Sequence, residues 1–177
     1  MHLELFSPAK INLFLRILGK RSDGYHNLAS LLQTVSLGDT LRFSLQSHED
    51  VLTCSDSNLR VDSSNLVLKA AALFRQRSGL SVYIKAYLDK IIPYEAGLGG
   101  GSGNAATTLW ALNEMTGSKF SEETLREWSS SIGAVIFVNH NGYVGKYLKE
   151  VKKICDENNV YMIEDSSQCL GIDGAFI

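Results

Sequence analysis

Hydrophobic and polar residues alternate along much of the first 90 residues, which is the period-2 pattern of half-buried β-strands. The pattern predicts four strands, over residues 11–18, 28–37, 40–46 and 81–88. Gly38-Asp39 separates two of these strands and favours a turn. The polar stretch 47–64 indicates a loop that carries one short strand.

Apolar residues recur at helical spacing in three further segments, which predict helices over residues 65–77, 102–116 and 122–132. Ser64 can cap the first helix, and Gly79 follows its last turn. Ser121 precedes the third helix, whose first turn carries the two acidic residues that a helix N-terminus favours.

The chain changes character after Gly133. Its pattern indicates a strand over 134–138, a basic amphipathic helix over 146–158 and a strand over 160–163. This strand–helix–strand order is typical of units that build parallel sheets, unlike the antiparallel pattern of the opening. We therefore predict an α+β fold for residues 1–134 with an appended strand–helix–strand tail over residues 135–177.

Composition narrows the possible functions. The chain has 177 residues, 45% hydrophobic and 20% charged, which suits one globular domain with a small appendage. A net charge of −2 argues against nucleic-acid partners and binding to membrane surfaces. We find no segment of transmembrane length and no signal-peptide pattern at the N-terminus. Cys54, Cys155 and Cys169 form no CxxC pair, so we expect free thiols and a cytoplasmic location.

Glycines cluster where the second helix begins, at positions 97, 99, 100, 101 and 103. Glycine lets successive backbone N–H groups point into one concavity, and a helix N-terminus adds partial positive charge. This combination predicts an anion site suited to a triphosphate. It is neither a Walker A loop, which ends in GK[ST], nor a Rossmann fingerprint. A flexible glycine-rich turn without a ligand is the alternative interpretation.

Four stretches match one family in the same order: residues 7–13 (SPAKINL), 23–26 (DGYH), 64–66 (SNL) and 93–107. Over residues 1–134 the chain resembles the diphosphocytidyl-methylerythritol kinases, which are GHMP kinases. Gly103 stands where those kinases usually have a second serine, which removes a hydroxyl but leaves the backbone site intact.

The resemblance implies the two-layer fold of the GHMP kinase N-terminal domain, which is similar to ribosomal protein S5 domain 2. It also implies phosphoryl transfer from ATP, with Mg²⁺, to a hydroxyl of 4-diphosphocytidyl-2-C-methyl-D-erythritol in non-mevalonate isoprenoid biosynthesis. Such chemistry relies on positioning and charge stabilisation.

The resemblance assigns a role to individual residues. Lys10 would be catalytic, orienting the substrate hydroxyl and offsetting developing negative charge. Asn12, Tyr25 and His26 would bind substrate, with Tyr25 stacking on the cytosine. Ser102 would lie near Mg²⁺ in addition to contacting the nucleotide. The nucleotide would be held by Asn65, Pro93, Gly97, Leu98, Gly99, Gly100, Gly101, Ser102, Gly103, Asn104 and Ala105.

The chain departs from the family after the third predicted helix. The family continues from helix-Gly-Ala into an aspartate, whereas here Gly133-Ala134 runs into Val135 and residues 90–155 contain no aspartate. Losing a general base typically costs about 10²–10⁴ in rate. Because the family's C-terminal domain is also missing from this sequence, we expect impaired turnover. The alternative is a non-catalytic nucleotide-binding module, or a chimeric fragment without activity.

The tail resembles a different family, the PLP-dependent nucleotide-sugar aminotransferases. There Asp165 would pair with the pyridinium nitrogen of PLP and Gln168 would lie beside the cofactor. No lysine follows Lys153, so the chain lacks the Schiff-base lysine that this chemistry needs. We therefore interpret residues 135–177 as an aminotransferase-like fragment without that activity.

Overall fold

The computed structural model describes residues 2–20 and 26–132, with side chains from residue 29 in the second range. The chain divides into two compact units, Met1–Ile136 and Phe137–Ile177, and all described residues belong to the first. The strands and helix expected in the tail, and with them Asp165 and Gln168, lie outside the described residues.

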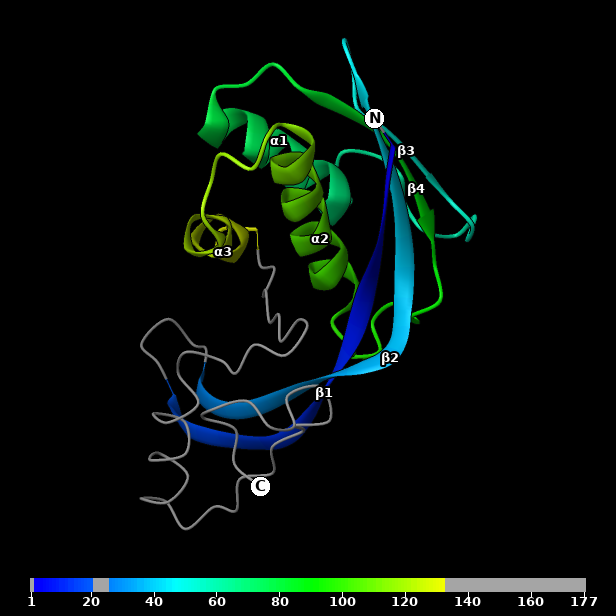
Figure 1. The fold of residues 1–177 in the computed structure, drawn as a ribbon. Coiled ribbons are helices and arrows are strands. Elements are labelled where there is room, and N and C mark those ends of the chain that lie inside the picture. The colour runs from blue at the N-terminus through cyan, green and yellow to red at the C-terminus, as the bar shows by residue number, and fades with distance from the viewer. Residues whose placement is uncertain (1, 21–25, 133–177) are drawn as a thin grey trace, which may run out of the picture. The chain divides into compact units, whose positions relative to one another are not determined.

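A four-stranded sheet forms one layer of this unit (Figure 1). Its order is β1-β2-β4-β3, with β1–β2 and β2–β4 antiparallel and β3–β4 parallel. The strands are β1 (His2–Lys20), β2 (His26–Gln46), β3 (Val51–Cys54) and β4 (Tyr83–Asp89). The short strand expected within the polar stretch 47–64 is therefore confirmed as β3.

Among the described residues, three helices form the second layer on one side of the sheet (Figure 1). They are α1 (Leu66–Ser78), α2 (Gly100–Met115) and α3 (Glu122–Ser130). Strands and helices are thus segregated into two layers, and the predicted α+β fold is confirmed.

The core lies between the sheet and the helices. Alternate strand residues point inward and are buried, as Leu41 and Phe43 do on β2 and Ile84 does on β4. Residues between them, such as Arg42 and Lys85, point to the other face and are exposed, as expected for a sheet covered on one side. The helices contribute both large and small core side chains: Val67, Ala70, Phe74, Ala105, Leu109 and Leu112.

Local signals in the sequence set the helix ends, with one correction. Asn65, not Ser64, caps α1, because its side chain accepts a hydrogen bond from the N–H of Val67 at 2.9 Å. Gly79 ends α1 in the left-handed conformation, with φ 71°. Ser121 caps α3 by accepting from the N–H of Thr124 at 3.2 Å.

The turn expected at Gly38-Asp39 is wrong, because β2 runs through both residues without a break. Gly38 is required for packing: a Cβ there would overlap the ring of Phe6. The β1–β2 register shifts beside it, between Pro8 and Lys10. The glycine thus marks close packing and a β-bulge inside a long strand pair.

Beyond this bulge, the β1–β2 pair extends past the helices (Figure 1). The alternating apolar residues of β1 predicted from the sequence lie on this extension. They are exposed, from 38% for Ile11 to 63% for Ile17.

Candidate active site

The Ser7–Asn12 segment of β1 packs against the glycine-rich loop that leads into α2. The N–H of Lys10 donates a hydrogen bond to the carbonyl of Leu98 at 2.9 Å. The aliphatic part of Lys10 lies against Gly99, where an added Cβ would come 3.0 Å from Lys10 Cγ. A Cβ on Gly103 would likewise lie 3.0 Å from Ser7 Oγ. The structure therefore brings together two of the sequence motifs that the family resemblance identified.

The loop enters α2 through left-handed glycines. Gly97 and Gly99 have φ angles of 72° and 75°, a region that side chains disfavour. Gly99 occupies the N-cap position, so the N-cap residue supplies no side-chain hydrogen bond, and the first turn carries no acidic residue. The N-terminus of α2 therefore keeps its partial positive charge and can receive an anion.

A polar cluster extends from Lys10 along the exposed surface of the β1–β2 pair. Lys10 Nζ donates to Asn12 Oδ1 at 2.7 Å, and Asn12 Nδ2 donates to Ser30 Oγ at 2.6 Å. Ser30 Oγ in turn donates to the carbonyl of Phe14 at 2.8 Å. We call Lys10, Asn12 and Ser30 the lysine cluster. It holds an ammonium group next to the loop that would receive phosphates.

Another polar cluster lies beneath the loop and centres on Asp39, which is fully buried. Asp39 Oδ1 accepts from the N–H groups of Ile91 and Ile92 at 2.8 and 2.7 Å. Asp39 Oδ2 accepts from Lys90 Nζ at 2.8 Å and from Asn104 Nδ2 at 2.9 Å. Lys90 also donates to the carbonyl of Ile92. We call Asp39, Lys90 and Asn104 the aspartate cluster.

The remaining nucleotide residues proposed from the resemblance lie in different environments. Asn65 uses both ends of its amide within the protein, since Nδ2 also donates to the carbonyl of Arg60 at 2.6 Å. Its neighbour Leu66 reaches α2, because a Cβ on Gly101 would lie 3.3 Å from Leu66 Cδ1. Ala105 belongs to the hydrophobic core, so only its backbone could face a ligand. Pro93 is exposed, and Ser102 is half-buried in the first turn of α2.

The pyrimidine side of the predicted site is not described. Tyr25 lies outside the described residues, and His26 is described only as the first backbone residue of β2.

The sequence interpretation missed Asp39, Lys90 and Ser30. A usable signal existed for Asp39, because it alternates with the apolar residues Leu41 and Phe43 and so shares their inward face. Assigning a turn at Gly38-Asp39 hid that alternation. No comparable signal in the sequence points to Ser30.

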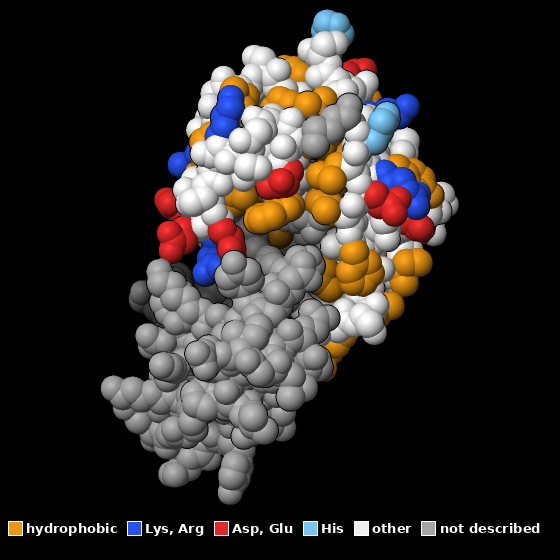
Figure 2. All heavy atoms as spheres, in the orientation of Figure 1, with side chains coloured by type: hydrophobic (Ala, Val, Ile, Leu, Met, Phe, Trp, Pro, Cys, Tyr) orange, Lys and Arg blue, Asp and Glu red, His pale blue; other side chains and the backbone are white. Residues whose placement is uncertain are grey.

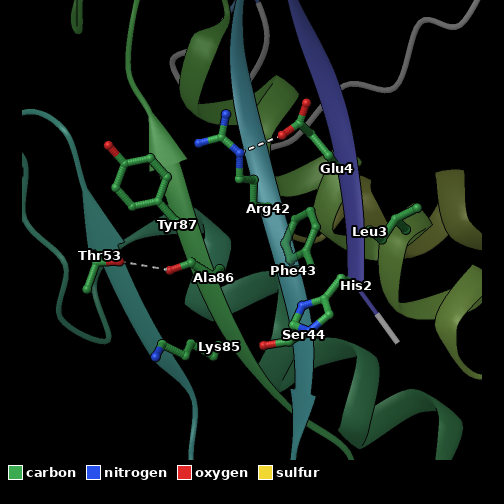
Figure 3. A pocket seen from close by; sticks show the side chains of 10 residues that line it. All are labelled: His2, Leu3, Glu4, Arg42, Phe43, Ser44, Thr53, Lys85, Ala86 and Tyr87. Carbon is green, nitrogen blue, oxygen red and sulfur yellow. Dashed lines mark hydrogen bonds and ion pairs between the residues drawn. The ribbon is translucent and has the colours of Figure 1, made fainter.

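A separate hollow of about 450 Å³ lies on the other face of the sheet (Figure 3). Cross-strand neighbours line it, including Glu4 and Arg42, which form an ion pair at 2.5 Å between exposed side chains. The hydrogen bond to Glu4, and then its charge, raise the pKa of Arg42. The lining residues are His2, Leu3, Glu4, Arg42, Phe43, Ser44, Thr53, Lys85, Ala86 and Tyr87. None of the residues that the resemblance implicates is among them.

Three further observations concern the surface charges, the helices and possible metal ligands. On the face drawn in Figure 2, basic and acidic side chains are intermixed, and no broad basic surface is visible on the coloured part. Among the described residues, no helix has the length and apolar character needed to cross a membrane. The same part of the chain holds no group of three His, Cys, Asp or Glu residues suited to a metal ion.

Known proteins match the N-terminal part of this chain. Residues 65–144 match the family model of the GHMP kinases N terminal domain. The 4-diphosphocytidyl-2-C-methyl-D-erythritol kinase of Protochlamydia amoebophila is 58% identical over 134 residues, covering 76% of this chain and 46% of that protein. The chloroplastic enzyme of the same name from Arabidopsis thaliana is 51% identical over 142 residues, covering 78% of this chain and 37% of that protein.

Solved structures agree with this assignment. A crystal structure of 4-(cytidine 5'-diphospho)-2C-methyl-D-erythritol kinase matches with a TM-score of 0.59 and 33% identity, over 75% of this chain and 46% of that one. Methanococcus jannaschii mevalonate kinase has the same fold, with a TM-score of 0.57 and 16% identity, over 76% of this chain and 48% of that one. This chain thus spans less than half the length of these four relatives. The N-terminal three quarters of the chain is homologous to the 4-diphosphocytidyl-2-C-methyl-D-erythritol kinases, and it contains a match to the GHMP kinases N terminal domain.

Proposed function

We propose that this chain binds Mg-ATP at the N-terminus of α2 and transfers a phosphoryl group to a hydroxyl of 4-diphosphocytidyl-2-C-methyl-D-erythritol. The observation that carries the proposal is the contact between Lys10 and the glycine turn that opens α2. The names of the Protochlamydia and Arabidopsis relatives support this substrate and a place in isoprenoid biosynthesis. A cytoplasmic location stays a prediction from the sequence.

The geometry of the loop fits a nucleotide phosphate. The positive-φ glycines and the uncapped N-terminus of α2 leave backbone N–H groups to meet phosphate oxygens. Gly97 to Gly103 would hold the phosphates, with Ser102 close to the magnesium ion. The bound nucleotide would supply the phosphoryl group, and its magnesium ion would neutralise charge on the phosphate oxygens.

Lys10 would act on the acceptor side. Its backbone is fixed to the loop by the hydrogen bond to Leu98, while its ammonium group is held by Asn12. A cation at this position can orient a hydroxyl group and stabilise the negative charge that develops during transfer. Asn12 and Ser30 would keep the ammonium pointed toward that hydroxyl.

A non-catalytic nucleotide-binding module is the second candidate. It is favoured by the missing aspartate after Ala134. This feature concerns the acceptor side, whereas the phosphate loop is complete in this chain apart from the hydroxyl lost at Gly103.

A phosphoryl-transfer assay beside an ATP titration separates the two candidates. The purified chain, proven folded by circular dichroism, is titrated with Mg-ATP in a calorimeter and then incubated with ATP and the proposed substrate. Product formation supports the kinase, and binding without product supports the module. No heat of binding from a folded chain would exclude both.

Substrate recognition needs a separate measurement. If Tyr25 stacks on the cytosine and His26 reads its edge, CDP should bind more tightly than UDP, and Tyr25→Ala should weaken CDP binding. Equal affinity for the two nucleotides would count against the cytidine-bearing substrate.

A further inference from the structure

One carboxylate fastens both ends of the segment that joins β4 to α2. Asp39 lies on β2, and its Oδ1 accepts from two consecutive backbone N–H groups, those of Ile91 and Ile92, just after β4 ends. Its Oδ2 accepts from Asn104, in the second turn of α2. The candidate phosphate loop lies between these attachment points in the sequence.

The same oxygen also neutralises a buried cation under the loop. Lys90 Nζ lies 2.8 Å from Asp39 Oδ2, and the two side chains are 6% and 0% exposed. A Cβ added to Gly100 would lie 3.3 Å from this Nζ, which places the ammonium directly against the first turn of α2. A buried charge is tolerated only when it is paired and hydrogen-bonded, and both partners meet that condition.

We infer that Asp39 is a positioning residue that fixes the conformation of the phosphate loop. It touches neither nucleotide nor acceptor in this role; it acts through Ile91, Ile92, Lys90 and Asn104. Its effect on ligand binding rests on the proposed function, while its effect on loop conformation does not.

Asparagine cannot replace this carboxylate. Asp39 faces four hydrogen-bond donors, and both of its oxygens accept two bonds each. The amide introduced by Asp39→Asn would turn an NH₂ group toward two of those donors in either orientation. The substitution therefore keeps the shape of the side chain and breaks one side of the cluster.

Asp50 offers a matched control at the opposite end of β4. Its Oδ1 accepts from the N–H of Ile84 at 2.9 Å, and its Oδ2 pairs with Arg75 at 2.6 Å. Like Asp39, it combines a hydrogen bond from a backbone N–H with an ion pair. Unlike Asp39, it has no described contact with the loop.

The experiment compares the parent chain, Asp39→Asn and Asp50→Asn by amide hydrogen exchange and by calorimetric titration with Mg-ATP. In Asp39→Asn the amides of Ile91 and Ile92 and those of residues 97–103 should exchange faster, and Kd for Mg-ATP should rise roughly tenfold or more. Asp50→Asn should lower the melting temperature but leave loop exchange and Kd within about twofold of the parent. Wild-type exchange in a folded Asp39→Asn, or an equal loss of affinity in Asp50→Asn, would overturn the inference.

A second variant, Asn104→Ala, and the exchange data by themselves provide further tests. If Asp39→Asn does not fold, Asn104→Ala removes only the attachment at α2 and should speed exchange at the start of α2 while Ile91 and Ile92 stay protected. Unchanged exchange at the start of α2 would overturn the inference. If the parent chain binds no Mg-ATP, the proposed function fails, and the exchange comparison still decides the role of Asp39.

Discussion

The lysine cluster and the aspartate cluster flank the same glycine loop but differ in their burial. Asp39 is fully buried, and four donors satisfy its carboxylate within the protein. Lys10 is half-buried, and the side chains that follow it, Asn12 and Ser30, are exposed. The lysine cluster is therefore a network on the surface, whereas the aspartate cluster is part of the buried interior.

For the proposed phosphoryl transfer, this difference indicates which half of the site is held in place before ligands bind. Four donors hold the buried Asp39 carboxylate, and breaking any of these bonds leaves an unpaired polar group away from water. The aspartate cluster therefore sets the shape of the phosphate loop without a ligand. The exposed lysine cluster exchanges bonds with water at low cost, so its groups can turn to an acceptor hydroxyl when one binds.

The largest expected effect is a loss of turnover, with little change in nucleotide binding, when Lys10 is substituted. Lys10→Met keeps the aliphatic contact with Gly99 and removes the ammonium group. Turnover should fall by about 10²–10³, the usual cost of losing one group that stabilises transition-state charge. Kd for Mg-ATP should change by less than about threefold, since Lys10 donates its side-chain bond to Asn12.

Steady-state kinetics and calorimetry on one preparation test this contrast. Asp39→Asn, which should mainly weaken nucleotide binding, is the opposing variant. An equal loss of nucleotide affinity in Lys10→Met and Asp39→Asn would contradict the predicted difference between the two clusters.

A second prediction concerns the point where the lysine touches the loop. Gly99→Ala would place a Cβ 3.0 Å from Lys10 Cγ and force a side chain into φ 75°. We expect a loss of about 1 kcal/mol in stability and a rise of about tenfold in Kd for Mg-ATP.

Gly79→Ala is the control, because Gly79 has φ 71° and nothing within 4 Å of an added Cβ. It should show a similar loss in the free energy of unfolding with unchanged nucleotide affinity. Equal effects of the two variants on Kd would mean that the loop responds to general destabilisation only.

Much of the fold was predictable because local patterns and tertiary packing agree. Alternation identified the strands, and capping residues such as Ser121 and Gly79 set helix ends within a few residues. The error at Gly38-Asp39 arose where a local turn signal competed with a tertiary demand. Gly38 is there to admit the ring of Phe6, which comes from a strand more than thirty residues earlier in the sequence.

The site was predictable only for its contiguous parts. The glycine loop and the β1 motif are short runs whose composition points to anion binding and, through the family resemblance, to phosphoryl transfer. The aspartate cluster joins positions 39, 90 and 104, and no local pattern connects residues so far apart. Burial of Asp39 could have been inferred from its alternation with Leu41, but its partners required the fold.

A third, smaller effect is expected at Asn65, which the resemblance places near the adenine. Because both ends of its amide bond the protein backbone, it resembles the aspartate cluster more than the lysine cluster. Asn65→Ala should lower stability by about 1 kcal/mol through loss of the helix cap. The melting temperature should fall by roughly 2–8 °C, and Kd for Mg-ATP should change by less than about threefold.

Asn65→Asp retains the acceptor for the N–H of Val67 and loses the donor to Arg60. It should therefore keep most of the stability. A large rise in Kd for Mg-ATP in both variants, without loss of stability, would place Asn65 among ligand-binding residues instead.

The smallest expected effect is a pH dependence just before α1. Asp62 Oδ1 accepts hydrogen bonds from the hydroxyl and the N–H of Ser64, at 2.5 and 2.8 Å. These bonds, the hydroxyl first, lower the pKa of Asp62 below its ordinary value of 3.8. The charged form is thus favoured in the folded chain, so the stabilisation is present above pH 3.8 and is lost as the pH falls through the lower folded value.

Asp62→Asn isolates this contribution, because the amide oxygen can still accept from Ser64 but does not titrate. Denaturant unfolding of both proteins between pH 7 and pH 2.5 should show the parent losing stability relative to Asp62→Asn only below about pH 4. Since Asp62 is fully exposed, solvent screens its interactions and the difference should be smaller than that of Asn65→Ala. A difference that stays constant over this pH range would show that the bonds to Ser64 do not favour the ionised carboxylate.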